Sequence, residues 1–76
     1  MNPLREFRDK HHLTVRRVAN ELGVTERTVI AWETGSFKPS NVRMSSIAHI
    51  MGIDFHFLEA EWQFWQSMLK HENSKS

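Results

Sequence analysis

Apolar residues recur every three or four positions through most of this chain, a period that predicts amphipathic helices. The clearest stripe lies between Thr14 and Gly23. Its apolar members are Val15, Val18, Ala19 and Leu22, and its polar face carries Arg16, Arg17, Asn20 and Glu21. The Thr14 hydroxyl can accept a hydrogen bond from the first turn, and Gly23 can end the helix in the left-handed conformation. We therefore predict a short helix between these two residues.

A second short helix is predicted to begin after Thr25, which can cap it, and to end before Gly35. On a helical projection Val29 and Trp32 share one face and are expected to pack, with Glu33 at the margin. The opposite face carries Glu26, Arg27, Ile30 and Ala31. Only a tight two-residue turn separates the two helices. This is the layout of a helix-turn-helix, in which the first helix braces the second so that it can lie in the major groove of DNA.

The outward face of the second helix suits the edges of DNA bases. Arg27 has the planar fork that matches guanine, which makes it the principal candidate for base readout. Ile30 and Ala31 can touch thymine methyl groups. Glu26 leaves two interpretations open, because it can accept a hydrogen bond from cytosine or simply favour the positive end of the helix dipole.

The order of residues in this stretch is more specific than its periodicity. It contains Val18-Ala19, Leu22-Gly23-Val24-Thr25, Thr28-Val29 and Trp32-Glu33-x-Gly35. This order resembles the lambda-repressor-like, Cro-like helix-turn-helix family, also called the xenobiotic response element type, and the resemblance covers residues 4–58. It implies an all-α, compact five-helix domain that binds double-stranded DNA. It also implies an ion pair between Arg8 and Glu33 that fixes the base of the reading helix.

Two further helices are expected around the central pair. The first runs from its cap, Asn2, to about His12. Its shared face carries Leu4, Phe7 and His11. The other follows a cap at Ser40 or Asn41 and ends at Gly52. Its buried stripe consists of Met44, Ile47, Ala48 and Met51.

Contacts to the DNA backbone are expected from two places. One is the start of the bracing helix. The other is the loop over residues 36–41, which the resemblance places along the DNA backbone, together with Arg43 just after it. The side chains expected to contact phosphates or sugars are Thr14, Arg16, Arg17, Lys38, Asn41 and Arg43. Thr25 and Thr28 are expected to reach a phosphate or a base.

The C-terminal part of the chain predicts one long helix, capped by Asp54 and unbroken to about Lys70. Its apolar seam consists of Phe55, Leu58, Trp62, Trp65 and Leu69, and Phe57, Phe64 and Met68 broaden it. Phe55 and Leu58 are expected to close the core. The remaining surface is too apolar for a solvated helix, so it must fold back on the domain or meet another chain. A homodimer is favoured, because tryptophan and phenylalanine are common interface anchors.

The residues predicted to form this dimer or partner interface are Trp62, Phe64, Trp65, Met68 and Leu69. The chain then divides into a DNA-binding domain over residues 1–58, a helical extension over 59–71 and a flexible polar tail over 72–76. With 76 residues it has room for one modest core, which a partner would help to stabilise.

Composition limits the class of protein. The chain has no cysteine, no apolar run near the ~20 residues that span a bilayer, and no signal-peptide pattern at its start. We therefore expect a soluble cytoplasmic protein without membrane contact. Its net charge of +1 is uneven, since residues 1–43 hold eight Lys and Arg against five Asp and Glu, whereas residues 44–76 hold two against four. The mild basic excess lies with the helix-turn-helix, so phosphate binding is expected to be limited and sensitive to salt.

No constellation of residues predicts catalysis. The five histidines are His11, His12, His49, His56 and His71. Two of them are adjacent, so they point in different directions on a helix, and the others lie far apart. None has a cysteine or a paired carboxylate at ligand spacing, so no metal site is expected. Nucleophile–base pairs, glycine-rich phosphate loops and paired acids are also missing. We therefore expect no catalytic residue, no cofactor and no enzyme.

The leading hypothesis is a sequence-specific transcriptional regulator of prokaryotic or phage kind, which binds a two-fold-related operator as a dimer with the helix over residues 25–33 in the major groove. The alternative is a protein-interaction module, such as an antitoxin or an accessory subunit, in which the helix-turn-helix is a scaffold. Val15 favours the alternative, because many family members carry at this position a glutamine that hydrogen-bonds to DNA. Either Thr14 or Arg16 replaces that contact, or DNA binding is weaker than usual.

Overall fold

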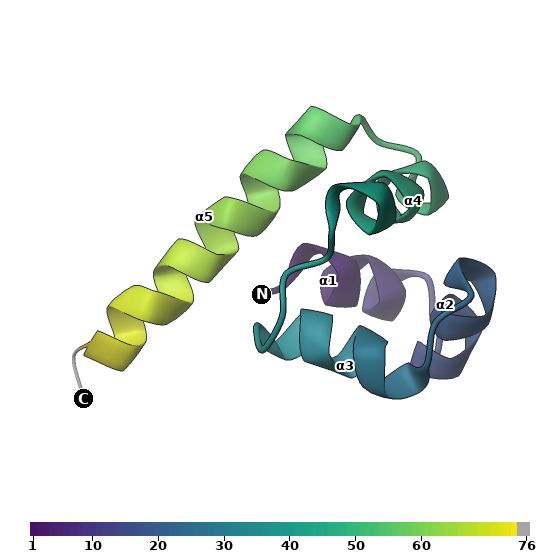
Figure 1. The fold of residues 1–76 in the computed structure, drawn as a ribbon, viewed down its shortest axis with the longest axis horizontal. Helices are drawn as coiled ribbons and strands as arrows, with labels where there is room; N and C mark the ends of the chain where they lie inside the picture. The colour runs from purple at the N-terminus through teal and green to yellow at the C-terminus, as the bar shows by residue number, and fades with distance from the viewer. Residues whose placement is uncertain (75–76) are drawn as a thin grey trace.

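The computed structural model of the protein describes residues 1–74, with side chains to Lys70. Five helices follow one another: α1 (Pro3–Lys10), α2 (Val15–Leu22), α3 (Glu26–Thr34), α4 (Asn41–Met51) and α5 (Phe55–Ser74). Figure 1 shows α1 to α4 gathered into one body, with α5 running along one side of it and beyond it. The described residues contain no strand, so the predicted all-α, five-helix architecture is confirmed.

Polar caps begin all five helices at the predicted residues, and left-handed glycines end α2, α3 and α4 where predicted. The N-caps of α1 to α5 are Asn2, Thr14, Thr25, Ser40 and Asp54. The hydroxyls of Thr14 and Thr25 accept hydrogen bonds from the backbone N–H three residues ahead, at 3.0 and 3.1 Å. Gly23 and Gly35 end α2 and α3 at φ 69° and 85°, values that side chains with a Cβ rarely adopt.

α1 ends earlier than predicted. It stops at Lys10 instead of near His12, because the backbone at His12 turns into the left-handed region, with φ 55°. The N–H of Leu13 then donates to the carbonyl of Arg8 at 2.8 Å, which closes the turn. This turn directs the chain from α1 into α2.

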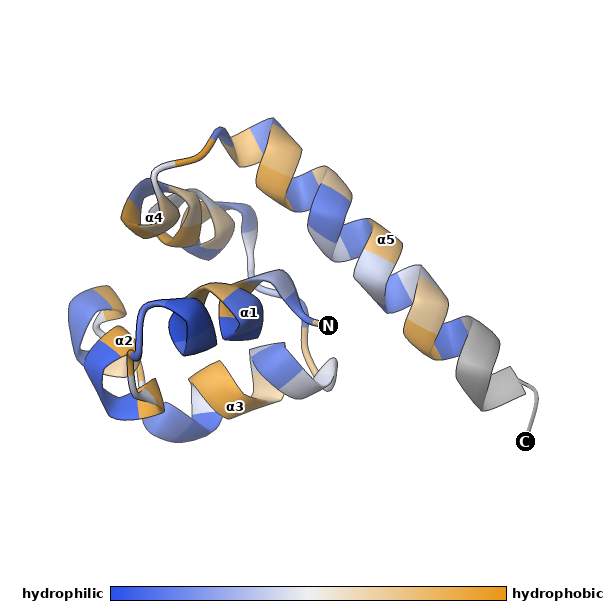
Figure 2. Cartoon of the chain, turned by 180° about the vertical axis from the view of Figure 1, so that it is seen from behind, coloured by the Kyte–Doolittle hydropathy of each residue, from blue (hydrophilic) through white to orange (hydrophobic). Residues whose placement is uncertain are grey.

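Every helix contributes to a single core. Its fully buried members are Leu4, Val18, Val29, Met44, Ile47, Leu58 and Trp62. Ala19, Leu22, Trp32 and Ala48 are almost as well buried. The apolar stripes predicted for α2, α3 and α4 therefore face inward. Figure 2 shows that hydrophobic bands also recur along α5, including the part that extends beyond the other helices.

Trp62 corrects one prediction of the sequence. It was expected at a dimer or partner interface, but its side chain is 0% exposed and belongs to the core together with Leu58. The reason is helical spacing: residues four apart share a face, so packing that buries Leu58 also buries Trp62. The Trp62 ring meets Trp65 edge-on, with ring centroids 6.1 Å apart. The core thus reaches one turn further along α5 than the predicted boundary at residue 58.

Beyond Trp62, α5 packs against the end of α3. A Cβ built on Gly35 would lie only 2.8 Å from Cδ1 of Leu69 and 3.4 Å from the ring of Trp65. Both side chains are half-buried. The predicted alternative that this helix folds back on its own domain therefore holds for these two residues.

α5 is also longer than predicted, since it continues to Ser74. Of the flexible tail predicted over residues 72–76, residues 72–74 belong to α5. Residues 75–76 lie outside the described part of the chain.

Candidate nucleic-acid interface

α2 and α3 form the helix-turn-helix, and the contact between them is apolar. The buried apolar residues that the two helices contribute are Val18, Ala19, Leu22, Val29 and Trp32. In the turn, Gly23 is left-handed, and the N–H of Val24 donates to the carbonyl of Ala19 at 3.0 Å. Thr25 has an extended backbone and caps α3. The hydrogen-bonded turn and the apolar contact together fix α3 on its brace.

The opposite face of α3 is open to solvent. Glu26 and Arg27 are exposed, and Ile30 is 48% exposed although it is apolar. Ala31 is half-buried. The packed face consists of Val29, Trp32 and Glu33. This division of α3 into a packed face and an open face is the predicted one. The open face combines a guanidinium with an aliphatic side chain, the chemistry that matches guanine and the thymine methyl group.

An ion pair between α1 and the packed face of α3 holds α3 in place. Nε and Nη2 of Arg8 donate to Oε2 and Oε1 of Glu33, each at 2.8 Å, so the ion pair that the resemblance implies is present, and it is bidentate. Nη1 of Arg8 donates to the carbonyl of Leu13 at 3.0 Å. The hydrogen bonds to Glu33 raise the pKa of the Arg8 guanidinium above its ordinary value. One side chain thus joins α1, the α1–α2 connection and the end of α3.

A second polar contact between α1 and α3 was not predicted. Asn2 is 2% exposed, and its Oδ1 accepts from the N–H of Arg5 at 2.9 Å, which is the predicted cap. Its Nδ2 donates to the carbonyl of Trp32 at 3.4 Å. The capping role follows from local sequence, whereas the contact to α3 joins residues 30 positions apart. No local pattern indicates such a contact.

Most candidates for DNA backbone contacts are accessible. The exposed members of this set are Thr14, Arg16, Arg17, Lys38 and Asn41. Nε of Arg17 lies 3.4 Å from Oε1 of Glu21, in an exposed pair of the kind that contributes little to stability. The hydroxyl oxygens of Thr25 and Thr28 are 2.9 Å apart, so at least one of their hydrogens is used within α3 and its cap.

Arg43 makes a structural contact that the sequence did not indicate. Its Nη1 donates to the carbonyl of Leu22 at 2.8 Å, and its side chain is half-buried. Leu22 is the last residue of α2, where carbonyls lack partners within the helix. Arg43 therefore joins the start of α4 to the end of α2, and the expected phosphate contact is left to its other nitrogens.

The residues of the predicted interface on α5 do not share one environment. Trp62 is in the core, and Trp65 and Leu69 are half-buried against the domain. Phe64 and Met68 are 67% and 49% exposed. Sequence reasoning left Phe57 out of the interface, yet it is exposed on the same helix. Its spacing of seven residues from Phe64 was the signal for it.

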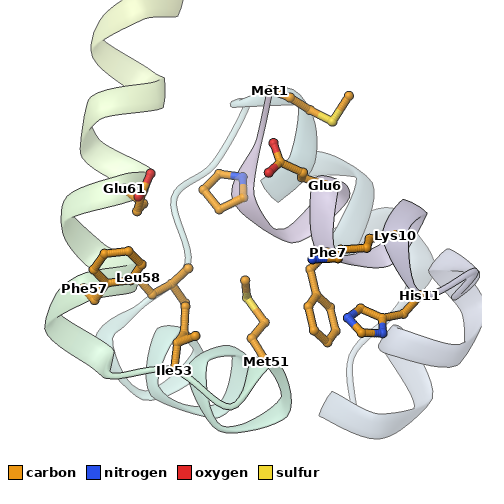
Figure 3. Close-up of a pocket in the computed structure, with 11 residues that line it drawn as sticks. Met1, Glu6, Phe7, Lys10, His11, Met51, Ile53, Phe57, Leu58 and Glu61 are labelled. Atoms are coloured by element: carbon orange, nitrogen blue, oxygen red, sulfur yellow. The ribbon is translucent and has the colours of Figure 1, made fainter.

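A hollow of about 480 Å³ lies between α1 and the first half of α5. Figure 3 shows Phe57 and Glu61 of α5 facing Glu6 and Phe7 of α1 across it. None of the predicted DNA contacts lines it. No group of three or more His, Asp or Glu within the described residues is placed to hold a metal ion. No helix in the described part is both long enough and apolar enough to cross a membrane.

Comparison with known proteins gives a consistent picture. A family model described as helix-turn-helix matches residues 4–58. An uncharacterized HTH-type transcriptional regulator of Methanocaldococcus jannaschii is 38% identical over 52 residues, which are 68% of this chain and 79% of that protein. Another such regulator, of Methanothermobacter thermautotrophicus, is 39% identical over 49 residues, 64% of this chain and 71% of that protein. No solved structure matches the chain.

Proposed function

The chain belongs to the lambda-repressor-like, Cro-like helix-turn-helix family, and we propose that it is a sequence-specific DNA-binding transcriptional regulator that places α3 in the major groove. This proposal rests on the division of α3 into a packed face and an open face. Its inner face is buried and tied through Glu33 to Arg8, while Arg27 and Ile30 stay open to solvent. A helix held in this way can present Arg27 and Ile30, beside Glu26, to the edges of bases. A regulator of this prokaryotic kind acts in the cytoplasm.

Arg27 is proposed as the principal base contact. Its side chain leaves the first turn of α3, the part of a recognition helix that enters the groove first. Ile30 and Ala31 would lie further along the same face and touch thymine methyl groups. Glu26 keeps both roles open, acceptor from cytosine or complement to the helix dipole, because its position in the first turn suits either.

Backbone contacts would set the orientation of the domain on DNA. The proposed contacts are Thr14, Arg16, Arg17, Lys38, Asn41 and the nitrogens of Arg43 that do not bond Leu22. Thr25 and Thr28 would reach a phosphate or a base with the hydroxyl hydrogen that their mutual contact leaves free. Because Val15 cannot replace the family glutamine, the phosphate contact at the start of α2 falls to Thr14 or Arg16.

We further propose that the protein binds a two-fold-related operator as a homodimer through the exposed apolar side chains of α5. Phe64 and Met68 support this proposal, because large apolar groups at 67% and 49% exposure mark an interaction surface. In such a dimer two copies of α3 would enter the major groove about one helical turn, roughly 34 Å, apart.

The alternative function, a protein-interaction module, has one specific observation in its favour. α2 begins at Val15 without the hydrogen-bonding side chain that many relatives use on DNA, whereas α5 presents exposed aromatic residues. In that case α5 would bind a different protein, and the α3 face would remain free. The exposed side chain of Arg27 in the first turn of α3, which α2 supports, favours the DNA-binding function instead.

The two functions are separated by selection from a random DNA pool followed by gel shift. Arg27→Ala should weaken binding to the selected operator by about 1–3 kcal/mol and relax specificity at one position. Arg5→Ala is the matched control, because it removes the same charge from an exposed site on α1 that is not a proposed contact. An equal loss on operator and random DNA would contradict base readout, and failure to select any operator would favour the interaction module.

A further inference from the structure

α5 carries a largely exposed apolar stripe, interrupted by Glu61, beside the face that packs on the domain. Its members Phe57, Phe64 and Met68 are 56%, 67% and 49% exposed. They stand at i, i+7 and i+11, so they share one face of the helix. Leu58 and Trp62 define the neighbouring, buried face. Large apolar side chains exposed together along a helix mark an interaction surface.

Two hollows lie along this stripe, and each has the spacing of a coiled-coil hole. The first hollow is lined by Phe57, Ala60, Glu61 and Phe64, at i, i+3, i+4 and i+7. In helix pairs that pack knobs into holes, one side chain of the facing helix inserts among four residues with this spacing. The small side chain of Ala60 leaves the space that such a knob needs.

The second hollow repeats this arrangement four residues further along. It is lined by Glu61, Phe64, Trp65 and Met68, with Met1 and Leu69 completing its wall. A helix that fills both hollows must therefore present two large apolar side chains four residues apart. The stripe itself contains such a pair, Phe64 and Met68, which makes a second copy of α5 a suitable occupant.

The relative direction of the two α5 helices follows from which side chains each arrangement would insert into the hollows. A symmetric parallel pair places every residue level with its own copy, so the first hollow would receive Ala60 or Glu61 of the partner subunit. Alanine would leave the hollow empty, and glutamate would place a second carboxylate beside Glu61, which lines the hollow, at a cost in desolvation and like-charge repulsion. An antiparallel pair with Phe64 level with Phe64 of the partner subunit instead inserts large apolar side chains, and Glu61 stays in the wall of each hollow. It brings Phe64 of the partner subunit into the second hollow and Met68 of the partner subunit into the first.

An antiparallel pair shifted by one turn is less complementary. It would place Phe64 of the partner subunit in the first hollow, but the second hollow would then receive only Ala60 of the partner subunit. We therefore propose that two copies of α5 pack antiparallel about Phe64, with Phe64 and Met68 of each copy filling the two hollows of the other. This inference rests on the homodimer proposed above and specifies its interface.

Disulfide cross-linking of the full chain tests the register, since the protein has no cysteine of its own. Ala60→Cys mixed with Met68→Cys should form a mixed disulfide, because these two positions are level in the proposed pair. Either variant alone should not cross-link, because in this register two copies of position 60 lie about 12 Å apart along the helix axis. Ala60→Cys alone cross-linking as fast as the mixture would overturn the antiparallel register while leaving the dimer intact.

Sedimentation tests the interface without cysteines. Phe64→Glu should convert the dimer into a monomer, whereas the control Gln63→Glu adds the same charge to an exposed position of α5 beside the stripe and should leave it dimeric. A wild-type chain that stays monomeric at all concentrations, or a Phe64→Glu variant that stays dimeric, would overturn the inference. Operator selection measures the DNA-binding function separately, so the two proposals fail by different measurements.

Discussion

Arg8 and Glu33, 25 residues apart in sequence, face each other with two parallel hydrogen bonds of 2.8 Å, and their side chains are only 13% and 5% exposed. Glu33 ends the packed face of α3, and Arg8 belongs to α1. The position of the proposed reading helix therefore depends on a charge pair that is largely removed from water. Such a pair is costly to break from one side, because the remaining charge stays buried without a partner.

We predict that Arg8→Met lowers the free energy of unfolding by about 3 kcal/mol, and that Glu33→Met does so by a similar amount. The double variant should lose less than both single variants together, because it leaves no unpaired charge. Urea unfolding measures all three. The control Arg17→Met breaks the exposed pair with Glu21 and should change stability by less than about 1 kcal/mol. Additive losses would contradict the coupling.

The pH dependence of this contribution follows from the pKa of Arg8. Since Glu33 raises that pKa in the folded state, the resulting stability is fully present below the pKa of an unfolded arginine and is lost only as the pH rises through the higher folded value. The stability difference between the native protein and Arg8→Met should therefore stay constant from about pH 6 to 10. Urea unfolding at several pH values measures this stability difference. A decrease within this range would show that another group controls the ion pair.

A second prediction concerns Trp62, which the sequence placed at an interface and the structure places in the core. Trp62→Ala should destabilise the fold by about 3–5 kcal/mol, because it opens a large cavity. Trp62→Phe should cost less, since it also removes an indole N–H that is buried without a hydrogen-bond partner among the described residues. Thermal unfolding at low protein concentration compares them. At this concentration Phe64→Ala, on the exposed stripe, should unfold at nearly the same temperature as the native protein.

A third prediction uses two glycines with similar backbones. Gly23→Ala should cost about 1–2 kcal/mol, because its φ of 69° strains any residue with a Cβ while nothing lies within 4 Å of that atom. Gly35→Ala should cost somewhat more, because its Cβ would also approach Cδ1 of Leu69 to 2.8 Å. The excess should disappear in a Leu69→Ala background, measured by urea unfolding. Equal costs in both backgrounds would show that α5 does not rest on the end of α3.

A fourth prediction concerns the salt dependence of DNA binding. Lys38→Ala and Arg16→Ala should each reduce the slope of log K against log salt by about 1, with similar losses on all DNA sequences. Arg16→Ala also tests whether this residue replaces the phosphate contact that Val15 cannot make. Lys10→Ala is the control, because it removes an exposed charge from the end of α1 and should leave the slope unchanged. The readout is gel shift at several salt concentrations.

Local chemistry explains which features the sequence predicts well. Thr14, Thr25 and Gly23 act on backbone groups within a few residues, so helix ends follow from neighbouring residue types. Family resemblance supplied the long-range pair of Arg8 and Glu33. Other long-range contacts had no such guide.

The contacts that were missed depend on how the helices pack together. Arg43 bonds the end of α2 and Asn2 bonds the end of α3, across 21 and 30 residues, and neither contact has a local pattern. The periodicity of α5 did place Trp62 on the same face as Leu58. Its interface assignment came instead from stopping the domain at residue 58, where the resemblance ends.

The contact of Trp65 and Leu69 with Gly35 has a geometric consequence for any assembly. A subunit held on the outer face of α5 is held by the same helix whose inner face touches the last turn of α3. The contact between the two copies of α5 and the open face of α3 would then move together as one rigid body. The spacing between half-sites that such a dimer accepts would be determined by the contact between the two copies of α5. Selection for a new operator spacing should therefore act there and leave the residues proposed to contact bases unchanged.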